Sequence, residues 1–292
     1  MLLLAAIVWG TGFVAQHKAM EGMPPFAFIA LRFFLGCLVL LPALILKKVG
    51  KKNPNAFNWK GFWRNLVLPS VLPGLFLFAG TSMQQLGIMT TSASKAGFLT
   101  AFYLVLVPVF GFFLGKKVNF WVWIGVVLTL VGVWFLSVNL EMSIQKGDIL
   151  VLIGALFWAL QILALDHFTP KLDALELAFG QFLTAALLGL VVNLTTESSL
   201  FGFDPSAWGP LLYSGVVAVG IGFTLQVFGQ SRVESALASL IMSLEAVFAL
   251  LGGMIILGER LSGREWFGSV VMLAAVILVQ LKGQQQKPEA RT

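Results

Sequence analysis

The chain has 292 residues, of which 58% are hydrophobic and 11% charged, and its mean hydropathy is +0.92. A water-soluble protein of this size needs a largely charged surface, which 19 Lys and Arg with 13 Asp and Glu cannot supply. The composition therefore excludes a soluble globular protein and requires a surface that faces lipid. The net charge of +6 needs no nucleic-acid partner, because basic loops are a normal topology signal in membrane proteins.

Long uncharged segments predict helices that cross the membrane. Residues 65–94, 118–140, 177–196 and 205–231 each lack any charge, and each is long enough to cross the hydrocarbon core. They lack the strict alternation of β-barrel strands, so the predicted fold class is an all-α membrane protein. In chain order, the ten predicted helices lie near residues 2–20, 26–46, 66–87, 93–115, 119–138, 147–166, 174–195, 207–230, 235–257 and 264–281.

The distribution of Lys and Arg predicts the orientation, because basic connections are retained in the cytoplasm more readily than they are translocated. Placing both termini in the cytoplasm also puts these basic residues there: Lys47, Lys48, Lys51, Lys52, Lys60, Arg64, Lys116, Lys117, Lys171, Arg232, Lys282, Lys287 and Arg291. The basic residues outside or near the outer ends are Lys18, Lys95, Lys146, Arg260 and Arg264. We therefore expect a multi-pass protein with cytoplasmic termini, whose basic connection after the second helix contacts membrane lipid.

The two halves of the sequence align at nearly constant offsets, which indicates an internal repeat. The aligned pairs are Trp9 with Trp158, Arg32 with Gln181, Gln84 with Gln226, and Trp123 with Trp266. The predicted units are a five-helix repeat over 1–142, a second over 143–282, and a cytoplasmic polar tail over 283–292. Because five is odd, the second repeat enters the membrane from the opposite face, which gives the inverted arrangement typical of transporters.

Several short motifs resemble one family of membrane carriers. Ile7-Val8-Trp9-Gly10 and Leu156-Phe157-Trp158-Ala159 open the two halves, residues 243–248 read SLEAVF, and residues 257–262 read LGERLS. Over essentially the whole chain, this pattern resembles the drug/metabolite transporter superfamily, EamA type, with Ala246 replacing the usual proline and Lys116 the usual Glu. The resemblance implies a ten-helix carrier of the cell inner membrane that exports amino acids, metabolites or amphiphilic toxic compounds.

Glu245 is the first candidate site residue, because it lies about midway along the ninth predicted helix. An ionised carboxylate at that depth costs roughly 2.5–3.5 kcal/mol on insertion scales, so something must offset the cost. One hypothesis is that Glu245 carries a proton and releases it when a cationic or amine-bearing substrate binds. The alternative is a structural carboxylate that is permanently protonated or paired with Arg.

Tyr103 occupies the repeat position equivalent to Glu245, so the two residues are expected to flank one cavity on the fourth and ninth helices. Thr100 shares the helical face of Tyr103 and is predicted to line the same pathway. The alternative is close helix packing, in which the Tyr hydroxyl finds an incidental partner.

Two tryptophans inside the first helices of the halves are candidates for holding an aromatic or cationic substrate by stacking or cation–π attraction. Trp158 lies in the interior of its helix, whereas Trp9 is near enough to an end to belong to an interfacial belt. Gln161 and Gln16 are expected on the same helical faces as Trp158 and Trp9, where an amide can hydrogen-bond a zwitterion.

Other polar residues have structural explanations that we prefer. Gln84 and Gln226 each lie on a Gly-x-x-x-Gln-x-x-Gly face, which favours helix packing. Arg32 is expected to snorkel or pair with a carboxylate, and Lys95 to lie among headgroups. His17, near the outer end of the first helix, is an alternative proton carrier, although an interfacial histidine is usually solvated.

The sequence contains no metal-binding His-Glu-x-x-His, no phosphate-binding glycine loop and no cluster of Cys or His, so we predict no metal, no cofactor and no enzymatic activity. The predicted function is export of small amphiphilic or zwitterionic metabolites, such as amino acids and organic cations, by alternating access with proton coupling. Uptake by proton symport, an uncoupled facilitator, and a non-transporting scaffold or lipid-handling protein are the alternatives. A Gly111/Gly115 pair leaves both a monomer and a homodimer open.

Overall fold

The computed structural model describes residues 1–49, 59–91, 93–137, 145–197, 199–257 and 262–284. Lys51, Lys52, Arg260 and the polar tail from residue 285, all assigned a side of the membrane from the sequence, lie outside the described residues. The side chains of Lys48, Lys60, Arg64 and Lys95 also lie outside the described part.

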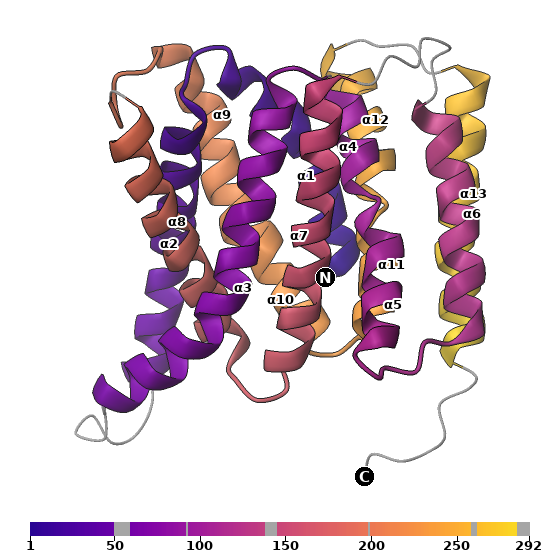
Figure 1. The fold of residues 1–292 in the computed structure, drawn as a ribbon, viewed down its shortest axis with the longest axis horizontal. Coiled ribbons are helices and arrows are strands. Elements are labelled where there is room, and N and C mark those ends of the chain that lie inside the picture. The colour runs from indigo at the N-terminus through magenta and orange to yellow at the C-terminus, as the bar shows by residue number, and fades with distance from the viewer. Residues whose placement is uncertain (50–58, 92, 138–144, 198, 258–261, 285–292) are drawn as a thin grey trace.

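The described residues form helices that follow one another as long rods. The first half contains α1 (Leu2–Met20), α2 (Pro25–Val49), α3 (Trp59–Ile88), α4 (Ala93–Thr100), α5 (Tyr103–Phe113) and α6 (Phe120–Ser137). The second half contains α7 (Lys146–Phe168), α8 (Ala174–Thr196), the 3₁₀ turn η2 (Pro205–Ala207), α9 (Trp208–Leu212), the π-helical segment η3 (Tyr213–Phe223), α10 (Thr224–Gln230), α11 (Ser235–Met242), α12 (Glu245–Leu257) and α13 (Gly263–Gln284). The rods stand roughly side by side (Figure 1), and the prediction of an all-α membrane fold is confirmed.

Length and surface chemistry fit a bilayer. Seven segments of the described chain are long and apolar enough to cross a membrane, and 120–132 and 266–282 are shorter apolar stretches. Exposed apolar side chains recur at helical spacing on the outer rods, as in Phe34, Leu38, Leu41 and Ile45 of α2. Such stripes face lipid, because water does not favour a continuous apolar surface. The count of ten membrane-crossing helices stays a prediction.

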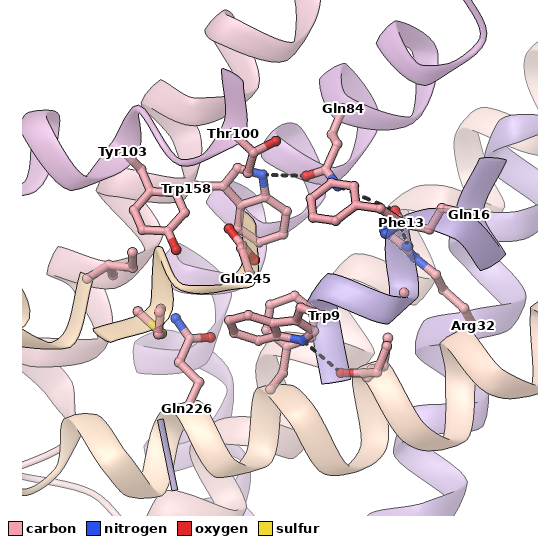
Figure 2. A pocket seen from close by; sticks show the side chains of 16 residues that line it. Trp9, Phe13, Gln16, Arg32, Gln84, Thr100, Tyr103, Trp158, Gln226 and Glu245 are labelled. Carbon is pink, nitrogen blue, oxygen red and sulfur yellow. Dashed lines mark hydrogen bonds between the residues drawn. The ribbon is translucent and has the colours of Figure 1, made fainter. Parts of the chain in front are cut away.

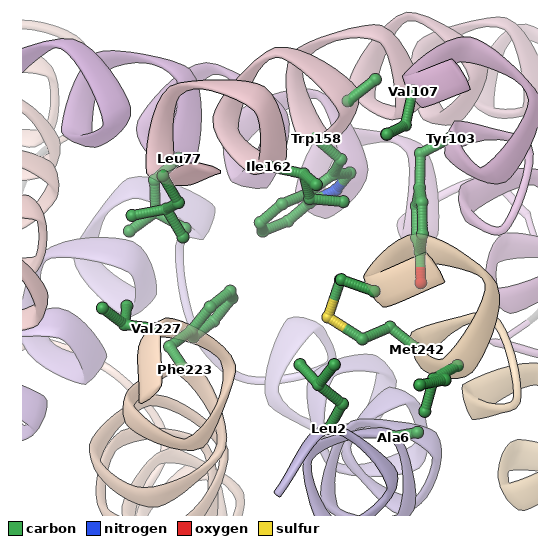
Figure 3. Packing of buried hydrophobic residues seen from close by; sticks show 14 of the residues in the cluster. Leu2, Ala6, Leu77, Tyr103, Val107, Trp158, Ile162, Phe223, Val227 and Met242 are labelled. Carbon is green, nitrogen blue, oxygen red and sulfur yellow. The ribbon is translucent and has the colours of Figure 1, made fainter. Parts of the chain in front are cut away.

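The two halves are inverted relative to each other and share one core. In Figure 1, α1 and α7, which open the two halves, run in opposite directions. Contacts between the halves are extensive, since α3 packs on α7 and α8, α2 on α8 and η3, α1 on α12, and α6 on α13. Figure 3 shows buried side chains of both halves meeting around one centre, among them Leu77 and Val107 from the first half and Ile162 and Val227 from the second.

The predicted fourth and ninth helices differ from the continuous spans that we expected. Each is interrupted for two residues, at 101–102 between α4 and α5 and at 243–244 between α11 and α12. The backbone tightens there, because the N–H of Leu104 donates to the carbonyl of Ala101 and that of Ala246 donates to Ser243, three residues back. The breaks fall at repeat-equivalent positions, so the internal repeat extends to backbone detail.

The predicted third and eighth spans also needed correction. Helix α3 begins at Trp59, earlier than the predicted start near residue 66, and it contains Pro69 and Pro73. The eighth span passes through the π-helical segment η3, whose glycines lie against α1 and α2. A Cβ on Gly220 would lie 2.9 Å from Val39 Cγ1, so the absence of a side chain lets α2 approach closely.

Gly115, one of the two glycines that left a second chain open, has a role at the end of a helix. Gly115 has a φ of +77° and ends helix α5. The N–H of the following residue, Lys116, donates to the carbonyl of Gly111 at 2.9 Å, which is the Schellman arrangement of a helix C-terminus. Gly115 is therefore a helix-capping glycine, and the choice between a monomer and a homodimer stays a prediction.

Substitution of Gly87 by Ala tests the close packing of α3 on α7. A Cβ at this position would lie 2.5 Å from Val151 Cγ2 and 2.7 Å from the carbonyl oxygen of Gly147, so the helices must separate. We expect Gly87→Ala to destabilise the protein by about 1–3 kcal/mol, seen as a lower unfolding temperature in detergent. Gly209→Ala is the matched control, because a Cβ there would meet nothing within 4 Å. Equal unfolding temperatures for the two variants would contradict this packing.

The carboxylate of Asp173, at one end of the bundle, predicts that the stability of the folded protein depends on pH. Partial burial raises the pKa of Asp173, but hydrogen bonds from Lys47 and from the backbone N–H groups of Glu176 and Leu175 outweigh it, so the pKa lies below its ordinary value of 3.8. A carboxylate with a lowered pKa stabilises the folded state at neutral pH, and this contribution is lost as the pH falls below about 4. At pH 7, Asp173→Ala should lower the free energy of unfolding by about 1 kcal/mol, seen as a lower unfolding temperature. The difference in unfolding temperature from wild type should shrink at acidic pH.

Glu234→Gln provides the control for Asp173→Ala. Glu234 occupies the same N-cap position of α11, yet it forms no side-chain hydrogen bond to the helix. Its substitution should leave the unfolding temperature unchanged at either pH. A constant difference between Asp173→Ala and wild type across the pH range would contradict the electrostatic explanation.

Candidate functional site

A buried cavity of about 50 Å³ lies where the two halves meet (Figure 2). Helices from both halves contribute to its wall, as expected for a substrate site between inverted repeats. Its volume holds roughly three or four water molecules, so a larger solute requires the halves to move apart. The lining residues are Trp9, Gly12, Phe13, Gln16, Arg32, Gln84, Thr100, Tyr103, Trp158, Ile162, Ala218, Val219, Phe223, Gln226, Met242 and Glu245.

The two helix breaks place an acidic centre in this cavity. Tyr103 begins α5 and Glu245 begins α12, each directly after its break, and Thr100 ends α4. All three are buried, and Figure 2 shows the Tyr103 hydroxyl directed toward the Glu245 carboxylate. Three polar atoms have no hydrogen-bond partner, namely Thr100 Oγ1, Tyr103 Oη and Glu245 Oε1.

Glu245 also has no ion pair with the described Lys, Arg and His residues. The Arg-paired structural carboxylate considered from the sequence is therefore not what the structure contains. Unpartnered buried polar atoms are rare, and each one calls for an explanation such as a ligand or water. Because three of them meet in one cavity, a polar group that enters the cavity is the simplest explanation.

Aromatic rings form the apolar wall of the cavity. The ring of Phe223 lies between those of Trp9 and Trp158, at centroid distances of 4.6 Å and 5.7 Å, and it stacks on Trp158 at 15°. Repeat-related glycines hold the two indoles, because a Cβ on Gly80 would lie 3.2 Å from Trp158 Cδ2 and one on Gly222 would lie 2.7 Å from Trp9 Nε1. Trp9 thus lies inside the bundle, where it donates to the carbonyl of Ala218 at 3.1 Å, and an interfacial belt role does not describe it.

A chain of hydrogen bonds, the first polar cluster, lies on one side of the cavity. It consists of Gln16, Arg32, Gln84 and Trp158. Trp158 Nε1 donates to Gln84 Oε1 at 2.9 Å, and Gln84 Nε2 donates to Gln16 Oε1 at 3.5 Å. Arg32 Nη1 donates to the same Gln16 oxygen at 3.0 Å. The cluster fixes the indole of Trp158 and presents a buried cation to the cavity.

A second chain of hydrogen bonds, the second polar cluster, consists of Gln161, Gln181 and Gln226. Of these, Gln181 and Gln226 occupy the positions equivalent to Arg32 and Gln84. Gln161 Nε2 donates to Gln181 Oε1 at 3.1 Å, and Gln226 Nε2 donates to Gln161 Oε1 at 3.1 Å. Gln226 lines the cavity, whereas Gln161 is fully buried behind it. The geometry therefore gives Gln161 a supporting position and no contact with the cavity.

The structure brings together six of the seven residues that we predicted to bind substrate. Trp9, Gln16, Thr100, Tyr103, Trp158 and Glu245 all line the cavity. His17 does not line it, because its side chain is 45% exposed and lies 4.0 Å from Glu21 near the C-terminal end of α1. The roles of these residues in binding stay predictions.

Sequence reasoning missed several cavity residues. It assigned Gln84 and Gln226 to helix packing and Arg32 to snorkelling or a pair with a carboxylate, yet all three line the cavity. The internal repeat had identified these positions, and a position that pairs across two halves is a candidate for the shared site. Phe13 and Phe223 carried no comparable signal, because the chain contains 26 phenylalanines.

A larger hollow of about 780 Å³ opens at the end of the bundle that holds the connections α5–α6 and α10–α11. It begins at Val107, one helical turn beyond Tyr103 on α5. Charged residues line its rim, including Lys116, Asp166 and Arg232. No group of three or more His, Cys, Asp or Glu that can hold a metal ion occurs in the part of the chain that the structure describes.

Two neighbouring glutamines on α3 give a matched test of the first polar cluster. Gln84→Leu removes the acceptor of the Trp158 N–H and leaves that buried donor unpaired, so we expect a loss of about 1–3 kcal/mol in stability. Gln85 is equally buried, but both of its side-chain polar atoms lack partners. Gln85→Leu should therefore leave the unfolding temperature unchanged or raise it. A similar loss in both variants would contradict the described network.

Comparisons with known proteins agree with this architecture. The sequence profile of the EamA-like transporter family matches residues 1–138 and, a second time, residues 145–281. An uncharacterized transporter of Archaeoglobus fulgidus is 33% identical over 96% of this chain and 85% of its own. YedA, an uncharacterized inner membrane transporter of Escherichia coli, is 29% identical over 94% of this chain and 88% of its own. A crystal structure of a protein 17% identical in sequence covers 98% of both chains with a TM-score of 0.76, which shows a shared fold.

Proposed function

The chain belongs to the EamA-like transporter family, and we propose that it is a secondary transporter that exports small amphiphilic or zwitterionic metabolites, such as amino acids and organic cations. The observation that carries this proposal is Glu245, a buried carboxylate with an unpartnered oxygen in a cavity between the two halves. An ionisable residue within a membrane-spanning bundle marks a substrate or proton pathway by default.

In the proposed cycle, the halves rock about the central cavity and expose it to one side of the membrane at a time. The 780 Å³ hollow serves as the vestibule at the end that we predict to be cytoplasmic, because it begins one turn from Tyr103 on the same helix. The substrate enters from this vestibule and leaves at the opposite end. No nucleotide is involved, so the energy comes from an ion or substrate gradient.

Each cavity residue has a proposed role. Glu245 binds the ammonium group of the substrate or, in its absence, a proton, and Tyr103 and Thr100 offer hydroxyls to the same polar group. Trp9 and Trp158 stack on the apolar part of the substrate, and Gln16 supports the polar end. His17 remains the alternative proton carrier at the outer rim.

We expect Glu245→Gln to lower the rate of substrate-dependent proton movement at least about tenfold below wild type, because a side-chain amide does not bind and release a proton as a carboxylate does. The measurement uses proteoliposomes with an internal pH dye, to which pools of amino acids and of organic cations are added. His17→Gln, tested in parallel, should leave the proton response intact. Glu21→Gln removes an exposed carboxylate beside His17 and serves as the matched charge control.

The same assay distinguishes the alternatives. Saturable flux of labelled solute without any proton response, in wild type and Glu245→Gln alike, would identify an uncoupled facilitator and remove Glu245 from the mechanism. Counterflow under pH gradients of opposite sign separates export from uptake by symport. The absence of any saturable solute flux would favour a scaffold or lipid-handling protein and overturn the proposal.

A further inference from the structure

Arg32 is a buried cation that the described structure leaves without a counter-ion. It lines the central cavity from α2, its side chain is 5% exposed, and it forms no ion pair with any described Asp or Glu. Its Nη1 donates to Gln16, whereas its Nε has no hydrogen-bond partner. A guanidinium at membrane depth is costly and normally pairs with an anion.

The surroundings of Arg32 stabilise its charge without using its hydrogen-bonding groups. The Cζ atom lies 5.0 Å and 5.1 Å from the ring centroids of Phe28 and Phe33, within cation–π distance. The rings stabilise the positive charge, but they do not supply hydrogen-bond acceptors for the planar fork of N–H donors that a guanidinium presents. Packing therefore explains why the side chain is tolerated, and it does not explain why the residue is an arginine.

The internal repeat supplies an independent comparison. The equivalent position in the second half is Gln181, whose Oε1 accepts a hydrogen bond from Gln161 Nε2, whereas Arg32 Nη1 donates one to Gln16. A neutral amide is thus sufficient for the hydrogen-bonded packing at this position of the fold. The positive charge is an addition in one half, at the position that faces the cavity.

A basic and an acidic side chain therefore lie in the wall of one small cavity. Arg32 comes from the first half and Glu245 from the second, and Figure 2 shows them on different sides of the lining residues with Trp9 between them in the view. They form no ion pair with each other. An organic cation alone leaves Arg32 unpaired and an organic anion alone leaves Glu245 unpaired, whereas a zwitterion pairs both groups.

We infer that Arg32 is the carboxylate-binding residue of the cavity, so that a zwitterion binds with its ammonium group facing Glu245 and its carboxylate on Arg32. The inference rests on the proposed transport function and adds to it a specificity-determining residue. The planar guanidinium matches a carboxylate through two parallel hydrogen bonds.

The test measures ligand-dependent thermal stabilisation of the purified protein with three matched pools. These are the protein amino acids, the amines that lack their carboxylates, and the carboxylic acids that lack their ammonium groups. For wild type, we expect the lowest half-saturating concentration with amino acids. In Arg32→Gln, which installs the residue of the second half, this concentration should rise at least about tenfold for amino acids and acids and should not rise for amines.

Two further variants keep the test independent of folding. Lys18 is an exposed cation in the last turn of α1 that does not line the cavity, so Lys18→Gln should behave as wild type. Arg32→Lys keeps the charge but loses the planar fork, so an intermediate loss for amino acids is expected even if Arg32→Gln does not fold.

The inference is overturned if wild type binds amines as well as amino acids, if no pool stabilises wild type, or if Arg32→Gln binds amino acids as wild type does. Its failure is separable from that of the proposed function. Proton movement driven by amines in both wild type and Arg32→Gln would remove the role of Arg32 and leave transport standing. Absence of all solute-dependent flux in wild type would remove both.

Discussion

Hydrocarbon offers no hydrogen-bond partners, so every polar group inside a membrane-spanning bundle must be paired by the protein or by something that enters it. The protein meets this requirement through amide networks at two levels, in which glutamines pair with one another, with Arg32 and with Trp158. Among the buried side-chain oxygens without a partner, those of Thr100, Tyr103 and Glu245 are the ones that line the central cavity. Their convergence on one cavity between the two halves is what marks it as a site.

The internal repeat explains how one chain builds such a centre. Equivalent breaks at 101–102 and 243–244 place Tyr103 and Glu245 at the starts of half-length helices, one from each half. Equivalent glycines, Gly80 and Gly222, hold equivalent tryptophans. Function then resides in the departures from symmetry, because the repeat alone makes two similar halves. Glu245 faces a tyrosine and Arg32 corresponds to a glutamine, so the charges belong to the cavity and not to the fold.

Composition and the positions of charges were enough to predict the fold class and most helix ends, since lipid solvation dominates the sequence. The breaks could not be predicted in the same way, because residues 101–102 and 243–244 contain neither Gly nor Pro and the change lies in the backbone hydrogen bonds. The direction in which each side chain points could not be predicted from the local sequence either. Gln161 and Trp158 share a helical face by spacing, yet the indole reaches the cavity while the amide turns to Gln181 and Gln226.

The placement of the polar ties between the halves bears on how the proposed rocking can occur. At one end of the bundle Lys47 pairs with Asp173 and Lys116 pairs with Asp166, and each pair joins the first half to the second. At the other end Thr91 donates to Asp148 at 2.7 Å, and the first N–H groups of α2 donate to Glu197. The two ion pairs are partly exposed, and such a pair contributes only about 0–1 kcal/mol, so separating the halves at that end costs little. The other end is held more firmly, because the Thr91–Asp148 hydrogen bond is buried and Gly87 packs against Gly147 beside it. The distribution of these contacts therefore favours opening first at the end that holds the ion pairs and the larger hollow, which is one of the two openings that alternating access requires.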